Sequence, residues 1–251
     1  MTFDFTGKSV IVAGGSRGIG RSIALGFAQA GAHVSICARG AAGLEATAAE
    51  LKAFGHKVHF APCNLGSATD IAAYIPAAAA ALGGIDVLVN NASGFGMGDS
   101  DEGWDAGTSV DVMATVRASR AALPWLEKAK GASIVNISSI SGLRPSLRTP
   151  AYGAVKAAVI HYTTSQAAAL SKKGIRVNCV APGSIEFPGG TWEARKTADP
   201  ALYNRVLSAI PFDRLGAPEE IANVVMFLAS PLASWVTAQT IAVDGGQLLG
   251  V

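Results

Sequence analysis

The sequence contains few charged residues and no cluster of one sign. Of its 251 residues only 15% are charged, and the formal net charge is +2. Proteins that bind nucleic acid as their main activity carry a basic patch, which this sequence lacks. Half of the residues are hydrophobic and the mean hydropathy is +0.35. We therefore expect a large buried core and no nucleic-acid partner.

Cysteine is also scarce. The three cysteines, Cys37, Cys63 and Cys179, are widely spaced and form no Cys-x-x-Cys pair. We therefore expect neither a disulfide framework nor a zinc site. Each cysteine lies in or next to an apolar run, which indicates a small buried side chain. The histidines form no cluster with the spacing of metal ligands, so we expect no metal.

Long apolar segments are missing as well. The longest stretches, such as residues 77–82, are much shorter than the ~18 residues that a membrane span needs. Residues 1–8 show no basic segment followed by an apolar one, the pattern of a secretory signal. We expect a cytoplasmic protein without membrane contact.

Short β-branched runs alternate with Ala-rich segments along the whole chain. The expected strands are residues 9–13, 33–37, 57–61, 85–89, 133–137, 176–180 and 240–243, and expected helices include 19–30, 43–54, 68–82 and 151–171. Such alternation predicts a mainly parallel sheet covered by helices on both faces. No linker or internal repeat divides the chain. We predict one doubly wound α/β domain of Rossmann type over residues 1–251, with seven strands and six or seven helices.

A tyrosine and a lysine lie four residues apart at Tyr152 and Lys156, with Ser139 upstream. On a helix this spacing places both side chains on one face. A lysine cation beside a phenol lowers the pKa of the phenol from about 10 towards neutrality, which suits proton transfer. A nearby serine hydroxyl can hold the oxygen that receives or loses the proton. Because the pair also occurs on solvated helix faces, only its context can favour a reaction at a carbonyl or an alcohol.

That context begins with a glycine-rich turn directly after the first expected strand. The segment reads Ala13-Gly14-Gly15-Ser16-Arg17-Gly18-Ile19-Gly20 and leads into the first expected helix. Glycines there permit a tight turn and a close approach of the backbone to phosphate, and the helix N-terminus offers free N–H groups. The segment predicts a dinucleotide-binding turn.

With these motifs the chain resembles the short-chain dehydrogenase/reductase family, in the branch that contains 3-oxoacyl-acyl-carrier-protein reductases. The family turn T-G-x-x-x-G-x-G is matched at Gly14, Gly18 and Gly20, with Ala13 in the place of threonine. Four further motifs occur in the family's order: Asn90-Asn91-Ala92, the Ser139, Tyr152 and Lys156 set, Pro182-Gly183, and Asp244-Gly245-Gly246. The resemblance covers essentially the whole chain.

The resemblance implies a nicotinamide cofactor held by residues of these motifs and of the strand ends. They are Gly14, Ser16, Arg17, Gly18, Ile19, Gly20, Arg39, Asn64, Leu65, Asn91, Ala92, Tyr152, Lys156, Pro182, Gly183 and Ile185. An acidic residue at the end of the second strand would favour NAD, but that position reads Cys37-Ala38-Arg39. Arg39 and Arg17 can bracket a 2′-phosphate, so we expect NADP(H) rather than NAD(H).

The resemblance also implies the catalytic roles. Tyr152 gives a proton to the substrate carbonyl, Ser139 hydrogen-bonds the same oxygen, and Lys156 assists the transfer and binds the nicotinamide ribose. The family's fourth member is an asparagine, whose equivalent here is Asp111. A carboxylate there can pair with Lys156 and weaken its effect on Tyr152.

A second departure follows Pro182-Gly183. Glu186 stands where the family often has a threonine on the nicotinamide carboxamide, which leaves the backbone of Ile185 to hold that group. Residues of about 187–210 are expected to form a substrate lid. Candidates for contact with the substrate, or alternatively for packing on the core or on another subunit, are Trp192, Leu202, Tyr203, Val206, Ser141, Leu143 and Phe95.

The favoured function is an NADP-dependent carbonyl reductase acting on a small molecule, commonly a 3-oxoacyl thioester linked to acyl-carrier protein or CoA. Lys130 and Lys173 match positions that such reductases use to dock the acidic carrier. A steroid, sugar or xenobiotic ketone fits the residues equally well. A catalytically weakened cofactor-binding regulatory protein is the alternative from another class. The resemblance further implies a homotetramer.

Overall fold

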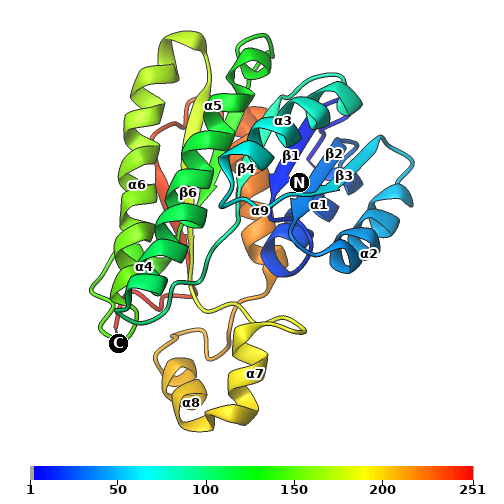
Figure 1. Ribbon diagram of the computed structural model, residues 1–251. Coiled ribbons are helices and arrows are strands. Elements are labelled where there is room, and N and C mark those ends of the chain that lie inside the picture. The colour runs from blue at the N-terminus through cyan, green and yellow to red at the C-terminus, as the bar shows by residue number, and fades with distance from the viewer. Residues whose placement is uncertain (1–2, 251) are drawn as a thin grey trace.

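The computed structural model describes residues 3–250 and contains one seven-stranded sheet (Figure 1). The strands are β1 (Ser9–Ala13), β2 (His33–Ala38), β3 (Val58–Pro62), β4 (Val87–Asn90), β5 (Ser133–Ile137), β6 (Arg176–Pro182) and β7 (Thr240–Val243). All neighbouring strands pair in parallel, in the order β3-β2-β1-β4-β5-β6-β7. The predicted strands are all confirmed, with boundaries that shift by at most two residues.

The helices between the strands lie where the Ala-rich segments predict them. They are α1 (Gly18–Gln29), α2 (Ala41–Lys52), α3 (Ala68–Leu82), α4 (Asp101–Ala106), α5 (Ala114–Leu126), α6 (Pro150–Leu170), α7 (Thr191–Ala198), α8 (Pro200–Ser208) and α9 (Pro218–Ala229). The described residues thus hold nine α-helices instead of six or seven. The difference arises because residues 187–210 fold into two short helices, and because a π-helical turn, Gly107–Met113, separates α4 from α5.

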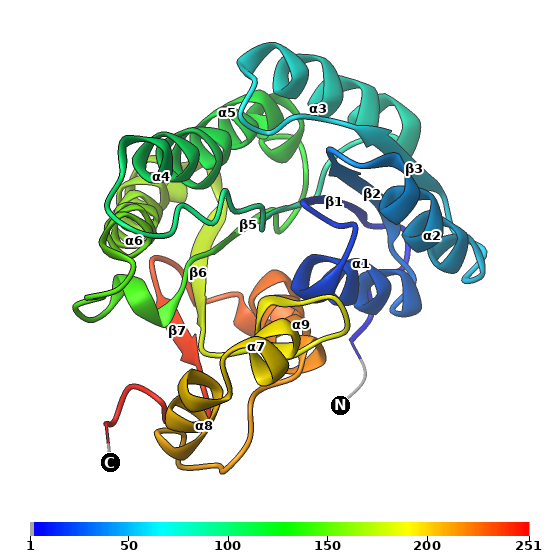
Figure 2. The ribbon, with the colours of Figure 1, turned by 60° about the horizontal axis from the view of Figure 1, so that its bottom comes forward.

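Helices cover both faces of the sheet (Figure 2), and an apolar cluster lies on each face. One core cluster joins the sheet to α1, α2 and α9, and it includes Phe27, Leu51 and Val225. The other joins it to α3, α5 and α6, and it includes Ile75 and Leu126. Strands covered on both faces need apolar side chains on both, which explains why β1 and β5 are buried along their whole length.

The strand order fixes the place of a ligand site. β1 lies between β2 and β4. The connections from β1 to β3 therefore step towards one side of the sheet, and those from β4 to β7 step towards the other side. In open α/β sheets ligands bind at the carboxyl ends of the strands, next to this reversal. The glycine turn follows β1, Asn91 follows β4 and Ser139 follows β5. The fold therefore brings these three predicted motifs to one edge of the sheet.

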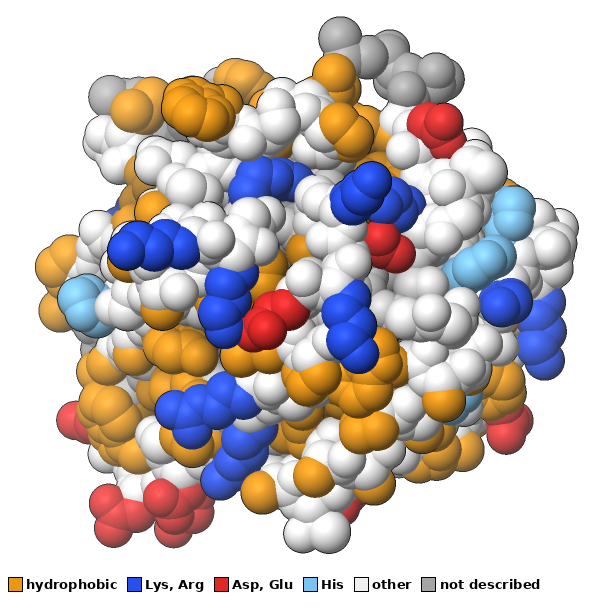
Figure 3. All heavy atoms as spheres, turned by 90° about the horizontal axis from the view of Figure 1, so that it is seen from above, with side chains coloured by type: hydrophobic (Ala, Val, Ile, Leu, Met, Phe, Trp, Pro, Cys, Tyr) orange, Lys and Arg blue, Asp and Glu red, His pale blue; other side chains and the backbone are white. Residues whose placement is uncertain are grey.

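Helices α7 and α8 form a separate small unit below that edge in Figure 1. Their apolar side chains pack with each other in a third cluster built on Tyr203, Ile210 and Leu215. The opposite edge of the sheet, where the strands begin, is the face seen in Figure 3, and Lys and Arg side chains gather on it.

Candidate active site

Helix α6 carries both Tyr152 and Lys156 on the side that faces the sheet edge. The helix begins at Pro150, whose fixed φ and missing N–H suit a first helical position. Lys156 is buried, with 2% of its surface exposed, while Tyr152 is half-buried. The Lys156 Nζ lies 5.6 Å from the centre of the Tyr152 ring. The predicted proximity of the phenol and the ammonium is therefore present.

Ser139 lies directly after β5, next to the same stretch of α6. Its Oγ accepts a hydrogen bond of 3.1 Å from the Ser141 N–H, which leaves its own O–H free to donate. The preceding Ser138 donates its hydroxyl to the Lys156 carbonyl over 2.8 Å. A Cβ on Gly142 would lie 2.7 Å from the Lys156 carbonyl carbon, so glycine lets this loop pack against the helix. The loop and α6 thus hold Ser139 beside the segment that carries Tyr152.

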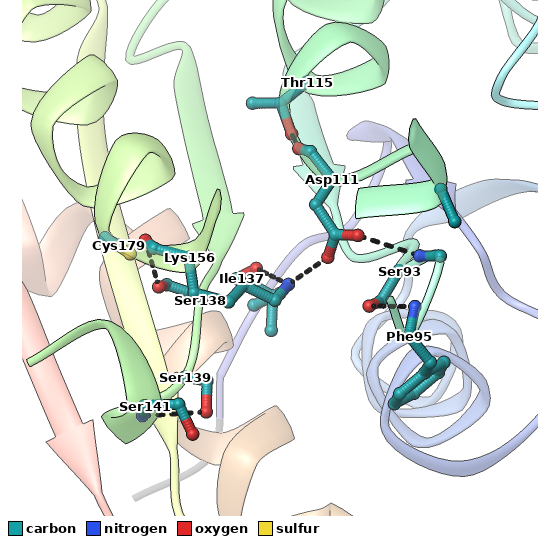
Figure 4. A network of polar contacts seen from close by, with 12 residues as sticks. Ser93, Phe95, Asp111, Thr115, Ile137, Ser138, Ser139, Ser141, Lys156 and Cys179 are labelled. Carbon is teal, nitrogen blue, oxygen red and sulfur yellow. Dashed lines mark hydrogen bonds and ion pairs between the residues drawn. The ribbon is translucent and has the colours of Figure 1, made fainter. Parts of the chain in front are cut away.

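The Lys156 ammonium has fixed partners on two further elements (Figure 4). It donates a hydrogen bond of 3.0 Å to the Ile137 carbonyl at the end of β5. It also forms an ion pair of 2.8 Å with Asp111 Oδ1. Burial alone would lower the pKa of Lys156, but the Asp111 carboxylate and the Tyr152 phenol more than offset burial and raise it. Lys156 therefore stays a cation at physiological pH.

Asp111 connects two parts of the site. It lies in the π-helical turn and is buried, with 1% exposed. While one carboxylate oxygen faces Lys156, the other accepts a hydrogen bond of 2.8 Å from the Gly94 N–H. Its backbone carbonyl accepts the Thr115 hydroxyl at 2.8 Å. The expected pairing of Asp111 with Lys156 is observed, and the link to Gly94 is an addition that the sequence did not predict.

The loop after β4 carries Phe95 against Tyr152. The two rings are nearly parallel, with an interplanar angle of 6° and centres 6.4 Å apart. The Phe95 N–H donates to Ser93 Oγ over 3.1 Å, and its φ of 49° lies in the left-handed region. Phe95, one of the predicted contact candidates, therefore lies next to the predicted proton donor.

The glycine turn forms a backbone cradle over the end of β1. The N–H groups of Gly14 and Gly15 donate to the Cys37 carbonyl, and Asn91 Nδ2 donates to the Gly14 carbonyl over 2.7 Å. A Cβ on Gly20 would collide with the Gly14 carbonyl. Helix α1 starts here without a side-chain cap and without an acidic residue in its first turn. Its N-terminal N–H groups are therefore available to an anion.

The predicted cofactor residues around the cradle differ in how many of their polar groups already have a partner within the protein. Arg17 and Arg39 are exposed, and neither forms an ion pair with an acid of residues 3–250. The Arg17 guanidinium donates to the Gly189 carbonyl over 3.3 Å. Asn64 is exposed, but its Oδ1 accepts the Gly66 N–H over 3.1 Å. The predicted acceptor of Asn64 is thus partly used within its own loop, and Leu65 beside it is buried.

In the segment after β6, the backbone N–H and C=O groups of one residue form no hydrogen bond within the described chain. The Glu186 N–H donates to the Gly216 carbonyl, and the Gly216 N–H donates to the Ser184 carbonyl. These bonds flank Ile185, whose own N–H and C=O have no partner among residues 3–250. They remain available to the amide that the sequence assigns to them. Pro182 ends β6, and Gly183 packs so tightly that a Cβ there would lie 2.7 Å from the Asp244 Cβ.

Glu186, in the segment between β6 and α7, is bonded to the α7–α8 unit. Its carboxylate accepts the Tyr203 hydroxyl over 2.8 Å and lies 3.4 Å from Lys196 Nζ. Tyr203 is buried and packs with Trp192 and Val206 in the third cluster. These candidates for substrate contact therefore pack on one another within the lid region. They pack neither on the main core nor, in the described chain, over Tyr152.

Comparisons with known proteins agree with this geometry. A family model described as enoyl-(acyl carrier protein) reductase matches residues 13–247. Isoepoxydon dehydrogenase patN of Penicillium expansum is 38% identical over 263 aligned residues, which cover all of this chain and 98% of that protein. The 3-oxoacyl-[acyl-carrier-protein] reductase FabG of Chlamydia trachomatis is 37% identical, over 96% of this chain and 97% of its own.

Two solved structures share the fold over nearly the whole length. L-sorbose reductase from Gluconobacter frateurii, complexed with NADPH and L-sorbose, superposes with a TM-score of 0.89 at 32% identity and full coverage of both chains. A 7α-hydroxysteroid dehydrogenase complexed with NADH superposes with a TM-score of 0.91 at 32% identity, over 98% of this chain and 96% of that one. The chain belongs to the short-chain dehydrogenase/reductase family. It is an oxidoreductase with the Rossmann-like fold of that family.

This dehydrogenase/reductase differs from the sequence-based expectation mainly in backbone features. The Ile137 carbonyl and the Gly94 N–H gave no side-chain signal in the sequence. The Phe187 ring covers Gly18 so closely that a Cβ on Gly18 would collide with it. Only the course of the segment after β6 reveals that contact.

Other predicted absences concern metals, disulfides and membranes. Residues 3–250 contain no group of His, Cys, Asp and Glu side chains that could hold a metal ion. The three cysteines are free and buried. Burial raises the pKa of Cys179, which lies behind Lys156, to about 11, so its thiol stays protonated. Among the described helices, none has the length and apolar character required to cross a bilayer.

Proposed function

We propose that this short-chain dehydrogenase/reductase transfers a hydride between NADP(H) and a ketone or secondary alcohol. The observation that carries the proposal is the environment of Lys156. The Lys156 ammonium is buried 5.6 Å from the ring of the half-buried Tyr152, and two other elements fix its position. Such a cation stabilises the phenolate that remains after Tyr152 has given up a proton.

The residues present fit a dinucleotide. The uncapped N-terminus of α1 and the glycine cradle suit a pyrophosphate. The open N–H and C=O of Ile185 suit a carboxamide, which offers one acceptor and two donors. Further contacts are proposed for Ser16, Asn64, Leu65, Asn91 and Ala92.

In the proposed mechanism the protein positions the substrate and moves one proton. When bound, NADP(H) supplies the hydride that the carbonyl carbon accepts. Ser139 donates its free O–H to the carbonyl oxygen and orients it. Tyr152 donates its hydroxyl proton to the same oxygen as the carbon is reduced. Lys156 stabilises the phenolate, and in the oxidative direction the same groups work in reverse.

We propose Asp111 as the anchor of Lys156. The ion pair fixes the ammonium under Tyr152, but part of its positive field is neutralised by the carboxylate. In the asparagine that is usual in the family, the neutralising charge is lost and one of the two acceptor oxygens is replaced by an NH₂ donor, so the side chain no longer accepts from both Lys156 and the Gly94 N–H.

Exposed arginines without acidic partners support NADP(H) over NAD(H). Arg39 directly follows β2, where an acid would bind a ribose hydroxyl, and Arg17 lies in the glycine turn. For Arg39→Ala we expect the Kd for NADPH to rise about tenfold to a hundredfold, the range for a lost hydrogen bond to a charged group, while binding of NADH, which lacks the 2′-phosphate, is little affected. Equilibrium titration with both nucleotides measures this. A parallel loss of both affinities would contradict the assignment.

The substrate is proposed to be a small carbonyl compound, with a 3-oxoacyl thioester as one candidate. FabG of Chlamydia trachomatis supports that candidate by its similarity. Lys130 and Lys173, however, lie just before β5 and β6 begin, whereas Tyr152 lies at the start of α6, beside the opposite edge of the sheet where the strands end. Lys173 also pairs with Glu127 over 2.6 Å. Within one chain they therefore cannot place a carrier protein at the site. A steroid, sugar or xenobiotic ketone is the alternative substrate. We further propose that the protein is a homotetramer and lies in the cytoplasm.

The decisive experiment follows NADPH oxidation by the purified protein with a panel of ketones and a 3-oxoacyl thioester. Turnover of at least one carbonyl compound is expected. The competing function is a cofactor-binding regulatory protein without catalysis, for which the substituted family asparagine is the motivating observation. NADPH binding without turnover of any ketone or thioester would favour that alternative and overturn the enzyme proposal.

A further inference from the structure

Phe95 is an aromatic residue in an unfavourable backbone conformation and a partly exposed position. Its φ is 49°, and 51% of its surface is exposed. A bulky residue without glycine's freedom adopts the left-handed region at a cost, and such strain clusters at functional sites. Although the ring lies beside Tyr152 in the described chain, about half of the residue remains open to contact with another molecule.

The neighbours of Phe95 hold it in this conformation. A Cβ on Gly94 would collide with the Ala106 carbonyl, and one on Gly96 would collide with the Gly103 carbonyl. The loop on both sides of Phe95 is therefore pressed onto α4 and the turn after it. Asp111 Oδ2 accepts the Gly94 N–H over 2.8 Å. The position of the ring is thus fixed from the buried core and not by chance loop geometry.

The ring of Phe95 borders the place where the substrate carbonyl must lie. Its plane is within 6° of the plane of the Tyr152 ring, and the centres are 6.4 Å apart. For a third ring to fit between the two, their centres would have to be about 7 Å apart, twice the usual contact distance. The observed separation is smaller, so a substrate lies alongside the two rings. Residues 93–98 read Ser-Gly-Phe-Gly-Met-Gly and contain no charged side chain. The loop beside the Tyr152 ring is therefore uncharged, and the Phe95 ring gives it a flat apolar surface.

We propose that Phe95 determines the substrate class, and that the preferred substrates are ketones with a flat, apolar ring attached to the carbonyl. Such a ring lies on the exposed part of the Phe95 face while the carbonyl oxygen reaches Tyr152 and Ser139. Offset stacking of this kind adds to the burial of apolar area. A polyhydroxylated ketone gains nothing from this wall, because Phe95 offers its hydroxyl groups no partner. The inference rests on the proposed carbonyl reduction and adds the substrate class to it.

The test compares acetophenone with 2-octanone, which have the same number of carbon atoms but differ in flatness. The wild-type kcat/KM for acetophenone is expected to exceed that for 2-octanone. In Phe95→Ala this ratio is expected to fall about threefold to tenfold, the range for an aromatic contact, chiefly through KM for acetophenone. Phe54→Ala, which removes another part-exposed phenylalanine at the end of α2, serves as the control and leaves the ratio unchanged.

Variants of Asp111 provide a second, independent test, because Asp111 holds the loop that carries Phe95 through its hydrogen bond with the Gly94 N–H. Asp111→Asn can keep one oxygen for the Gly94 N–H, with its NH₂ group towards Lys156, so the selectivity ratio is expected to change less than in Asp111→Ala. Asp111→Ala removes that acceptor, and the ratio is expected to fall as in Phe95→Ala. Should Asp111→Ala not fold, the Phe95 variant alone decides.

Each result has one meaning. A ratio that is unchanged in Phe95→Ala, or a wild-type preference for 2-octanone or for a ketose over acetophenone, overturns the inference about Phe95 but leaves carbonyl reduction intact. If the wild type reduces no ketone at all, the proposed function itself fails.

Discussion

The surroundings of Lys156 and the α7–α8 unit are built in opposite ways. Lys156 is buried and fixed by contacts from β5, α6 and the π-helical turn, all parts of the two large layers. Helices α7 and α8 enclose only a small cluster, and a Glu186–Tyr203 hydrogen bond helps to join them to the end of β6. Proton transfer needs groups held to a fraction of an ångström, whereas substrate entry needs a part that opens at low cost. Under the proposed function, the rigidly packed part carries the proton transfer and the peripheral unit admits the substrate.

The strongest test of this contrast is Tyr152→Phe. Removing the hydroxyl takes away the proposed proton donor but keeps the ring that packs beside Phe95. We expect kcat for ketone reduction to fall about 10²- to 10⁴-fold, the usual contribution of a general acid, with NADPH affinity preserved. Tyr162→Phe on the same helix is the matched control. Equal losses in both variants would show that the effect comes from helix packing and not from the hydroxyl.

Asp111 tests whether the buried pair holds the site together. Asp111→Ala leaves the Lys156 cation buried without its counter-charge, and such a loss costs about 3–5 kcal/mol of unfolding free energy. Asp111→Asn keeps the size and a hydrogen-bond acceptor, so we expect a smaller loss of stability with activity retained or raised. Urea unfolding and steady-state kinetics measure both. A large loss of activity in a well-folded Asp111→Asn would contradict the view that the carboxylate weakens Lys156.

Tyr203→Phe addresses the peripheral unit. It removes the hydroxyl that bonds Glu186 and leaves the aromatic packing with Trp192 in place. For one partly exposed hydrogen bond we expect a loss of about 1 kcal/mol or less. The effect should appear as a severalfold change in KM for the ketone, with kcat much less affected. A fall in kcat comparable with that of Tyr152→Phe would show that the unit takes part in proton transfer.

The smallest effect is expected from the exposed Arg214–Glu220 pair, which follows α8. The Arg214 guanidinium and the Ala217 N–H lower the pKa of Glu220 from 4.5 to about 2. Because the folded-state pKa is depressed, the stabilisation is complete above about pH 4.5 and is lost as the pH falls towards 2. Both side chains are largely exposed, so solvent screening limits the contribution to less than about 1 kcal/mol.

Thermal unfolding of wild type and Glu220→Gln between pH 7 and pH 3 measures this contribution. The wild type should be slightly more stable at pH 7, and the difference should shrink on acidification. A difference that grows as the pH falls would contradict the assigned direction of the pKa shift.

Most of the sheet and the Tyr152–Lys156 arrangement could be predicted from the sequence. Buried parallel strands read as short β-branched runs, and the i, i+4 rule places two side chains on one helix face whatever surrounds them. The pairing of Asp111 with Lys156 also followed, because the family motif fixes which position faces the lysine. These features depend on local patterns or on a shared framework.

The features that escaped prediction depend on the course of the backbone. The parallel contact of Phe95 with Tyr152 requires a φ of 49° at a residue that rarely adopts it. The Phe187 ring reaches Gly18 only because of how the segment after β6 turns. The start of α8 within the lid region does have a sequence signal, because Asp199-Pro200 is an N-cap residue followed by a proline at the first helical position. In the structure Asp199 accepts the Leu202 N–H over 3.0 Å.

The central claim is that this site reduces a carbonyl carbon with a hydride from NADP(H). The most direct measurement uses NADPH carrying deuterium at the transferable position of nicotinamide C4, with a ketone such as acetophenone as acceptor. The account predicts a secondary alcohol with deuterium on the carbinol carbon, formed by the wild type and lost in Tyr152→Phe. Alcohol without deuterium at that carbon, or equal formation of the labelled alcohol by both proteins, would contradict it.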